Sequence, residues 1–305
     1  PALAQNCTVS VTATNFGTID LTTGAAWTTT APFSTSCTNG PVNGSIRMCI
    51  SFGSGTGGGA ATGSPRLLLS GGNQLQYSLY TSAAYTTVWG SYSWAWSGTY
   101  PGVQIDIPTN AARAGSATRT IYGRISPSQQ TLPTGTYTSN FTTAHTLVRY
   151  ANGTGGSCAA GTVTARTVRP TFTVSATYAP VCRVAASTLD FGSIGLLGSI
   201  RDAASALSVT CSNGTAYTAA LDNGLGAGVT GPTARKMTGP ASATVTYGLY
   251  RDAARSLPWG TGVGLVYSGT GAGTAQNVPV YGRVPVQATP APGSYSDTIV
   301  VTITY

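Results

Sequence analysis

The sequence predicts an all-β protein made of two β-sandwiches in tandem. Three observations support this prediction: many short segments alternate apolar and polar residues, Gly, Pro and Asn-Gly separate them, and a repeat divides the chain in two. No segment has a sustained helical period. The length of 305 residues is enough for two domains, each with a core of its own.

Five sequence blocks recur in the same order in both halves of the chain. They are Cys7-x8-Phe16-Gly17 with Cys182-x8-Phe191-Gly192, Cys37-Thr38-Asn39-Gly40 with Cys211-Ser212-Asn213-Gly214, Tyr77-Ser78-Leu79-Tyr80 with Tyr247-Gly248-Leu249-Tyr250, Ile121-Tyr122-Gly123-Arg124 with Val280-Tyr281-Gly282-Arg283, and Gly135-Thr136-Tyr137 with Gly293-Ser294-Tyr295. Five ordered matches are poorly explained by chance. We interpret the chain as a duplication, with units of roughly 5–170 and 179–305.

The repeat also suggests how the six cysteines pair. Cys7–Cys37 and Cys182–Cys211 occupy equivalent positions, so we expect equivalent disulfides there. Cys49–Cys158 then remains as a bridge special to the first unit. A metal site is the alternative, but the chain has no C-x-x-C and a single histidine, so no metal is expected.

The N-terminus and the cysteines indicate an exported protein. Residues 1–4, Pro-Ala-Leu-Ala, resemble the cleavage end of a secretory signal, and we interpret them as a signal-peptide remnant. An even number of cysteines agrees with a disulfide-forming compartment. No apolar run approaches the length of a membrane span, so no membrane-spanning segment is expected.

Charge and composition argue against catalysis and against nucleic-acid binding. There are 15 basic residues against seven Asp and no Glu, a net charge of +8. The arginines are dispersed singly along strand-like segments, whereas a nucleic-acid binder clusters them on one face. One His and scattered Asp offer no acid–base pair, so neither an enzyme nor a cofactor is expected.

The segment at 171–178 alternates strictly, with Phe172, Val174, Ala176 and Tyr178 on one face and hydroxyl side chains on the other. It follows a complete domain-like stretch and precedes Cys182. We expect it to close the first sandwich, whereas the second unit ends at the alternating segment 298–305 with no further strand. A sandwich without its final strand exposes a groove and an unpaired edge, which strand addition in trans can fill.

These motifs resemble the spore coat protein U domain family, which includes subunits of archaic chaperone–usher pili. The Cys-x8-Phe-Gly opening, the Tyr-Gly-Arg block and the closing Gly-x-Tyr-x-Asp-Thr-x-x-Val-x-Ile-x-Tyr at 293–305 carry the resemblance. It implies immunoglobulin-like sandwiches, each lacking a last strand that a neighbour's N-terminal extension supplies. The two-unit arrangement is similar to that of a tip adhesin of Csu-type pili.

The resemblance implies a domain plan and a set of partners. Residues 5–170 would be the N-terminal adhesive domain, 171–178 the linker and donor strand that completes it, and 179–305 the C-terminal pilin domain. Between the signal-peptide remnant and Cys7 there are only Gln5 and Asn6, so the first unit is expected to accept a strand and not to donate one, as at a pilus tip. The implied partners are a periplasmic chaperone, an outer-membrane usher and the next subunit's donor strand, with export through the periplasm to the cell surface.

The resemblance further implies that apolar loops of the first unit attach the pilus to hydrophobic or host surfaces and support biofilm formation. The candidate contact residues are Trp27, Tyr85, Val88, Trp89 and Tyr100. The repeat weighs against Trp89, since it aligns with Trp259 and a large apolar residue in both units is typical of a core. Two alternatives remain: a tip lectin that binds a glycan, and a structural pilus or spore-coat subunit without an adhesive role.

Overall fold

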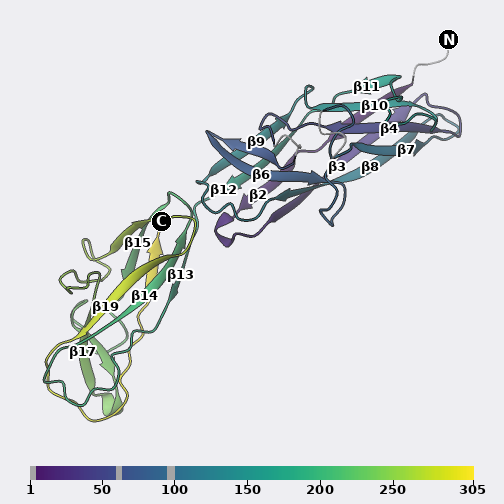
Figure 1. Cartoon of the computed structure of the whole chain (residues 1–305). Helices are drawn as coiled ribbons and strands as arrows, with labels where there is room; N and C mark the ends of the chain where they lie inside the picture. Colours follow the sequence, from purple (N-terminus) through teal and green to yellow (C-terminus); the bar gives the residue numbers. More distant parts are fainter. Residues whose placement is uncertain (1–4, 60–63, 95–99) are drawn as a thin grey trace. The chain divides into compact units, whose positions relative to one another are not determined.

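The computed structural model describes residues 5–59, 64–94 and 100–305 (Figure 1). The chain divides into two compact units, Pro1–Ala179 and Pro180–Tyr305, and the helical content of the described residues is limited to the short turns η1 (Leu21–Thr23) and η2 (Pro240–Ser242). The all-β prediction is therefore confirmed. The proposed signal-peptide remnant at 1–4 lies outside the described residues.

Unit 1 is a sandwich of two sheets. The larger has the strand order β1-β3-β8-β6-β5-β9-β12-β2, and the smaller has the order β11-β10-β4-β7. The strands are β1 (Asn6–Val11), β2 (Thr14–Ile19), β3 (Trp27–Thr38), β4 (Ser45–Phe52), β5 (Arg66–Ser70), β6 (Asn73–Tyr80), β7 (Val103–Pro108), β8 (Gly115–Ile125), β9 (Gly135–Phe141), β10 (Thr146–Asn152), β11 (Arg166–Val168) and β12 (Phe172–Tyr178).

Aromatic rings fill the core of unit 1. Phe52 stacks on Trp89 with ring centroids 5.1 Å apart, and Phe141 stacks on Phe172 at 4.3 Å. Phe33 packs against both Phe52 and Trp89. These residues come from β3, β4, β9, β12 and the segment after β6, so the core joins both sheets and depends on β12.

Strand β12 lies between β9 and β2. It runs antiparallel to β9, with Phe172 opposite Phe141 and Tyr178 opposite Gly135, and parallel to β2, with Val174 opposite Thr14. Its apolar residues are all buried: Phe172 is 7% exposed, Tyr178 is 1% exposed, and Val174 and Ala176 are fully covered. The alternation in the sequence therefore matches one core face and one outer face of this strand.

Unit 2 repeats this plan with fewer strands. Its sheets have the orders β13-β14-β19-β17-β16 and β18-β15-β20. The strands are β13 (Cys182–Ala186), β14 (Arg201–Cys211), β15 (Ala216–Leu221), β16 (Arg235–Thr238), β17 (Thr244–Tyr250), β18 (Tyr267–Thr270), β19 (Gln276–Val284) and β20 (Val301–Thr304). Within the described residues, unit 2 has no counterpart of β12, and its segments 187–200 and 285–300 form no strand.

Three of the repeated sequence blocks contact one another in each unit. The Phe16 ring lies edge-on to Tyr77 at 6.4 Å, and the Phe191 ring lies edge-on to Tyr247 at 6.2 Å. The glycine of the Tyr-Gly-Arg block leaves room for this ring: a Cβ at Gly282 would approach the Phe191 ring to 2.9 Å. The motifs of the repeat therefore form the same packing contacts in both units.

Among the described residues, each unit also buries one arginine, which no sequence motif predicts. Arg66 donates to the carbonyl oxygens of Phe52, Gly53 and Trp89, and Arg235 donates to the equivalent backbone of unit 2, including the carbonyl of Trp259. Burial lowers the pKa of Arg66 to about 10. Their charge-assisted hydrogen bonds satisfy carbonyls at the places where the chain leaves the sheets.

The three disulfides join the pairs that the repeat suggests. Cys7–Cys37 and Cys182–Cys211 each connect directly opposite residues of the first two paired strands of a unit. Cys49–Cys158 instead ties β4 to the loop after β10, across 109 residues of sequence. This loop covers the outer face of β4, where Cys49, Cys158 and Val163 form a small buried cluster with Tyr92 beside it.

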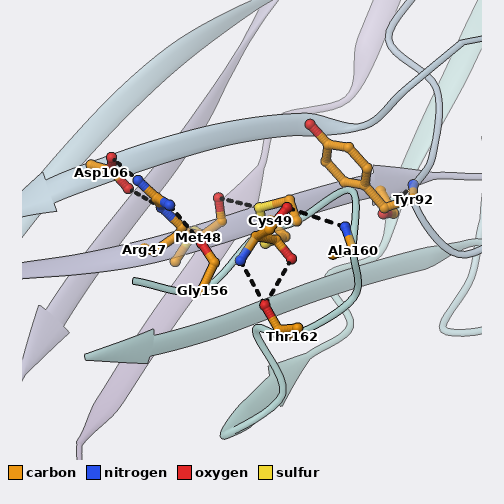
Figure 2. Close-up of a disulfide and its surroundings, with 11 residues drawn as sticks. Arg47, Met48, Cys49, Tyr92, Asp106, Gly156, Ala160 and Thr162 are labelled. Carbon is orange, nitrogen blue, oxygen red and sulfur yellow. Dashed lines mark hydrogen bonds and ion pairs between the residues drawn. A yellow bond between two sulfur atoms is a disulfide. The ribbon is translucent and has the colours of Figure 1, made fainter. Parts of the chain in front are cut away.

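Figure 2 shows how the surroundings of Cys49–Cys158 hold this loop in place. The Arg47 guanidinium makes two hydrogen bonds of 2.7 Å to Asp106 on β7 and one to the carbonyl of Gly156 in the loop. Within the loop, Thr162 accepts a hydrogen bond from the backbone of Ser157. The bridge and this ion pair together fasten a polar loop over an otherwise open sheet face.

Candidate functional site

The candidate functional site is a groove in unit 2 at the place that β12 occupies in unit 1. In unit 1, β12 is held between β2, which carries the Phe16-Gly17 block, and β9, which begins with the Gly135-Thr136-Tyr137 block. In unit 2 the equivalent blocks lie at 191–192 and 293–295. No strand of the described chain lies between them.

Two adjoining cavities occupy this position. One of about 460 Å³ and one of about 690 Å³ share Leu189, Phe191, Met237 and Tyr295 in their walls. Tyr247, Leu249 and Val280 from the sheet line the bottom of the first, and Ile299 and Val301 line its side. Among the wall residues, Tyr295 and Ile299 align with Tyr137 and Phe141 of β9, the strand that pairs with β12 in unit 1, and polar residues such as Asp190 and Asp297 line the walls as well.

The exposed fractions of equivalent side chains show the effect of the strand that unit 2 lacks. In unit 1, Phe16, Ile19 and Tyr137 are 7%, 2% and 0% exposed. Their counterparts in unit 2, Phe191, Ile194 and Tyr295, are only partly buried. Since the motifs are the same in both units, the difference in burial follows from the presence of β12 in one and its absence in the other.

The backbone beside the groove is also less paired than in unit 1. In unit 1, β12 forms ladders with strands on both sides, over seven positions with β9. In unit 2, the segment that corresponds to β9 makes one isolated bridge, between Thr238 and Ser296. An apolar groove flanked by open backbone groups is suited to receive an extended segment with alternating apolar side chains. The alternation at 171–178 predicts the strand that fills such a groove in unit 1 but not the groove residues of unit 2, which their alignment with Phe16, Ile19 and Tyr137 could have identified.

Two of the predicted contact residues are part of the core, so the prediction that they bind a surface is wrong. Trp89 is 1% exposed and Val88 is 6% exposed. The segment turns back on β6, since Val88 bridges Tyr80 and the amide of Trp89 donates to the carbonyl of Leu79. This pairing directs the Trp89 ring onto Phe33 and Phe52, as the alignment with Trp259 indicated.

The other three predicted contact residues, Trp27, Tyr85 and Tyr100, are half-buried and do not form one patch. Trp27 belongs to the face of β3 that carries the buried Phe33, and its Nε1 donates to the carbonyl of Asp20. Tyr85 contacts Tyr122, whose position in β8 faces outward opposite Thr30. Trp27 and Tyr85 therefore belong to opposite faces of the β3–β8 layer.

Groups that would support other kinds of site are not assembled in the described parts of the chain. Over residues 5–59, 64–94 and 100–305, no three His, Cys, Asp or Glu side chains are grouped to hold a metal ion. Within the same ranges, no helix has the length and apolar character needed to span a membrane.

The fold and the groove define a two-domain immunoglobulin-like protein whose second domain is one strand short. The family model of the spore coat protein U domain matches residues 1–144 and 168–302, so the chain belongs to this family. The first matched region lies within unit 1, and the second covers β12 and most of unit 2. Among curated proteins, none matches the sequence.

The fold is similar to that of a chain in a solved complex from a chaperone–usher pilus. A chain in the crystal structure of the CsuC–CsuE chaperone–tip adhesion subunit pre-assembly complex, from archaic chaperone–usher Csu pili of Acinetobacter baumannii, is 16% identical, with a TM-score of 0.58 over 98% of this chain and all of that chain. The CupB6 tip adhesin from Pseudomonas aeruginosa is 14% identical, with a TM-score of 0.40 over 99% of this chain and 95% of that one.

Proposed function

We propose that this protein is the tip adhesin of a chaperone–usher pilus. In this proposal, unit 2 anchors the protein to the fibre by receiving a strand from the next subunit, and unit 1 makes the adhesive contact. A periplasmic chaperone would fill the same groove before assembly, and an outer-membrane usher would export the complex to the cell surface. The fold shared with a pilus tip subunit over nearly the whole chain supports this proposal.

The single observation that carries the proposal is the unequal number of strands in the two units. The segment ahead of Cys182, β12, is already paired along both edges inside unit 1. The same chain therefore cannot offer β12 to a neighbour without opening its own first domain. With its groove open and β12 occupied, the protein can receive a strand from a neighbour but cannot donate β12 in return.

Donor-strand complementation of unit 2 can be tested with a peptide that copies residues 170–180. The full chain is incubated with this peptide, and amide hydrogen exchange is followed by mass spectrometry. Segments 187–200 and 289–300 should gain protection, because a ligand at about 100 times its Kd stabilises the bound state by about 2.7 kcal/mol. A peptide with the apolar positions replaced by Ser is the control. Protection that appears only in unit 1, or equally with the control peptide, would contradict the proposal.

Assembly in cells can be tested with neighbouring substitutions on one segment of unit 2. Ile299 lines the groove, whereas Val300 is 55% exposed beside it. Ile299→Asp should abolish display on pili, since a charge buried against an incoming apolar strand is costly. Val300→Asp adds the same charge outside the groove and should leave display nearly unchanged. Equal display of the two variants would reject the groove as the assembly site.

Adhesion to hydrophobic or host surfaces, and through it biofilm formation, is assigned in this proposal to unit 1. Of the predicted contact residues, Tyr85 and Tyr100 are the half-buried ones left in its loops once Val88 and Trp89 are placed in the core. Replacing both by Ser should reduce attachment to polystyrene at constant pilus display. Attachment equal to that of the wild type would remove them from the contact surface.

A further inference from the structure

Comparison of the two units at equivalent strand positions singles out a polar site on unit 1. In β3 and β8, Thr28 faces Arg124, and in β14 and β19, Asp202 faces Arg283. The next pairs along the strands are also equivalent, because the register of one ladder repeats the other. Thr28 in unit 1 therefore stands where unit 2 has an aspartate.

In unit 2 these positions form a closed ion-pair cluster. Asp202 accepts hydrogen bonds of 2.8 and 2.9 Å from Arg283, and it lies 3.1 Å from Arg255. The hydrogen bond from Arg283 keeps the pKa of Asp202 below its usual range. The Arg255 guanidinium also lies over the Tyr281 ring, 5.8 Å from its centre.

In unit 1 the cation remains but its carboxylate does not. Tyr85 replaces Arg255 in the same turn, as the positive φ angles of 53° and 60° at the two residues show. The Arg124 guanidinium lies 5.6 Å from the centre of the Tyr85 ring. In the part of the chain that the structure describes, no carboxylate pairs with Arg124. Its charge is therefore available to a ligand.

The surroundings of Arg124 offer rings and hydroxyl groups. Tyr85 lies edge-on to Tyr80 at 5.5 Å and to Tyr122 at 6.4 Å, and all three rings are partly exposed. Thr28 and Thr30 are exposed on the same outer face of β3. Beside Tyr122, a cavity of about 430 Å³ is lined by Thr81, Arg119 and Thr120.

The charge of unit 1 favours an acidic ligand. Its sequence has eight Arg and two Asp, whereas unit 2 has seven basic residues and five Asp. Both acids of unit 1 are already used within the fold, since Asp106 pairs with Arg47 and Asp20 caps η1. The domain therefore carries an excess of cations that its own carboxylates do not neutralise.

We propose that the cluster of Arg124, Tyr80, Tyr85, Tyr122, Thr28 and Thr30 binds an acidic sugar unit of a polysaccharide. The sugar carboxylate or sulfate takes the place of the missing Asp202 side chain and pairs with the guanidinium in the bidentate manner that arginine favours. The C–H face of the sugar packs on the tyrosine rings, and the threonine hydroxyls bond its hydroxyl groups. A single cation beside aromatic rings and hydroxyl groups suits a sugar. A nucleic acid backbone would instead require a continuous basic groove.

The test measures binding of the purified full chain to immobilised polygalacturonate, with its neutral methyl ester as the matched ligand. Thr28→Asp should reduce binding roughly tenfold or more, because it restores the internal partner and a charged hydrogen bond contributes that much. Ser36→Asp adds the same charge to the same face of β3, roughly 27 Å away at about 3.4 Å per residue, and should retain most of the binding. Arg124→Gln should match Thr28→Asp, and Arg283→Gln, in the closed cluster of unit 2, should have little effect.

Several results would overturn the proposal. They are equal binding of the ester and the acid, equal loss in Thr28→Asp and Ser36→Asp, and tighter binding of double-stranded DNA than of polygalacturonate. Dextran sulfate as a second acidic polymer distinguishes a carboxylate ligand from a sulfate ligand. Circular dichroism checks the fold of each variant, and Arg124→Gln decides the matter if Thr28→Asp does not fold. Because the assay needs no pilus, its outcome is separate from that of the assembly experiments.

Discussion

The stability of unit 1 should depend on Phe172, which lies in β12, the last strand of this unit along the chain. Phe172 is 7% exposed, stacks on Phe141 at 4.3 Å and lies 5.1 Å from Phe52. Phe172→Ala removes these contacts and leaves a cavity in the aromatic core. Such truncations cost about 3–5 kcal/mol, whereas a whole domain is stable by about 5–15 kcal/mol. The variant should therefore lose a large fraction of the free energy of unfolding of unit 1.

Hydrogen exchange followed by mass spectrometry assigns this loss to a unit. Peptides from β9 and β2 should exchange faster in Phe172→Ala, while those from β14 and β19 should be unchanged, because β12 pairs only within unit 1. Thr177→Ala, on the exposed face of the same strand, is the control and should shift stability by less than about 0.5 kcal/mol. A loss in unit 2, or equal losses in the two variants, would refute the assignment of β12 to the first core.

Three further predictions concern the disulfide, the repeat glycine and an ion pair. Replacing Cys49 and Cys158 together by Ala should cost about 2–5 kcal/mol in urea unfolding, since the bridge closes a long loop, and an unchanged midpoint would contradict this. Gly282→Ala should displace the Leu189 side chain and the Phe191 ring and so lower the melting temperature of unit 2, and an unchanged melting temperature would contradict this. The hydrogen bond from its arginine partner lowers the pKa of Asp106, so Asp106→Asn should weaken unit 1 at pH 7, and the difference should disappear as the pH falls through the lowered pKa. A difference that persists in acid would exclude the ion pair as its cause.

The repeat accounts for most of what could be predicted about the fold. Alternation identifies strands because a strand with one buried face repeats every two residues. The alignment of the two units suggested the disulfide partners without any geometry, and it placed Trp89 opposite Trp259, a core position in both units. The error at Val88 and Trp89 came from treating a segment near aromatic residues as a loop tip, when it turns back and pairs with β6.

The cluster around Arg124 shows why the sequence alone was insufficient for sites. Thr28 and Arg124 are far apart in the chain, as are Asp202 and Arg283, and no sequence block aligns Thr28 with Asp202. Only the strand register brings each pair face to face and shows that one is an ion pair and the other is not. Likewise, arginine is usually a surface residue, so the sequence does not predict that Arg66 and Arg235 are buried. Their hydrogen bonds to backbone carbonyl groups are formed only when the sheets pack together.

By itself, the sequence determined the strand content, the duplication and the presence of one spare alternating segment, because these follow from local periodicity and from self-similarity. The tertiary structure decided where that segment lies, which apolar residues stay partly exposed without it, and which charges find partners. Those outcomes depend on neighbours supplied by distant strands, so the same Phe-Gly motif is sealed in one unit and open in the other.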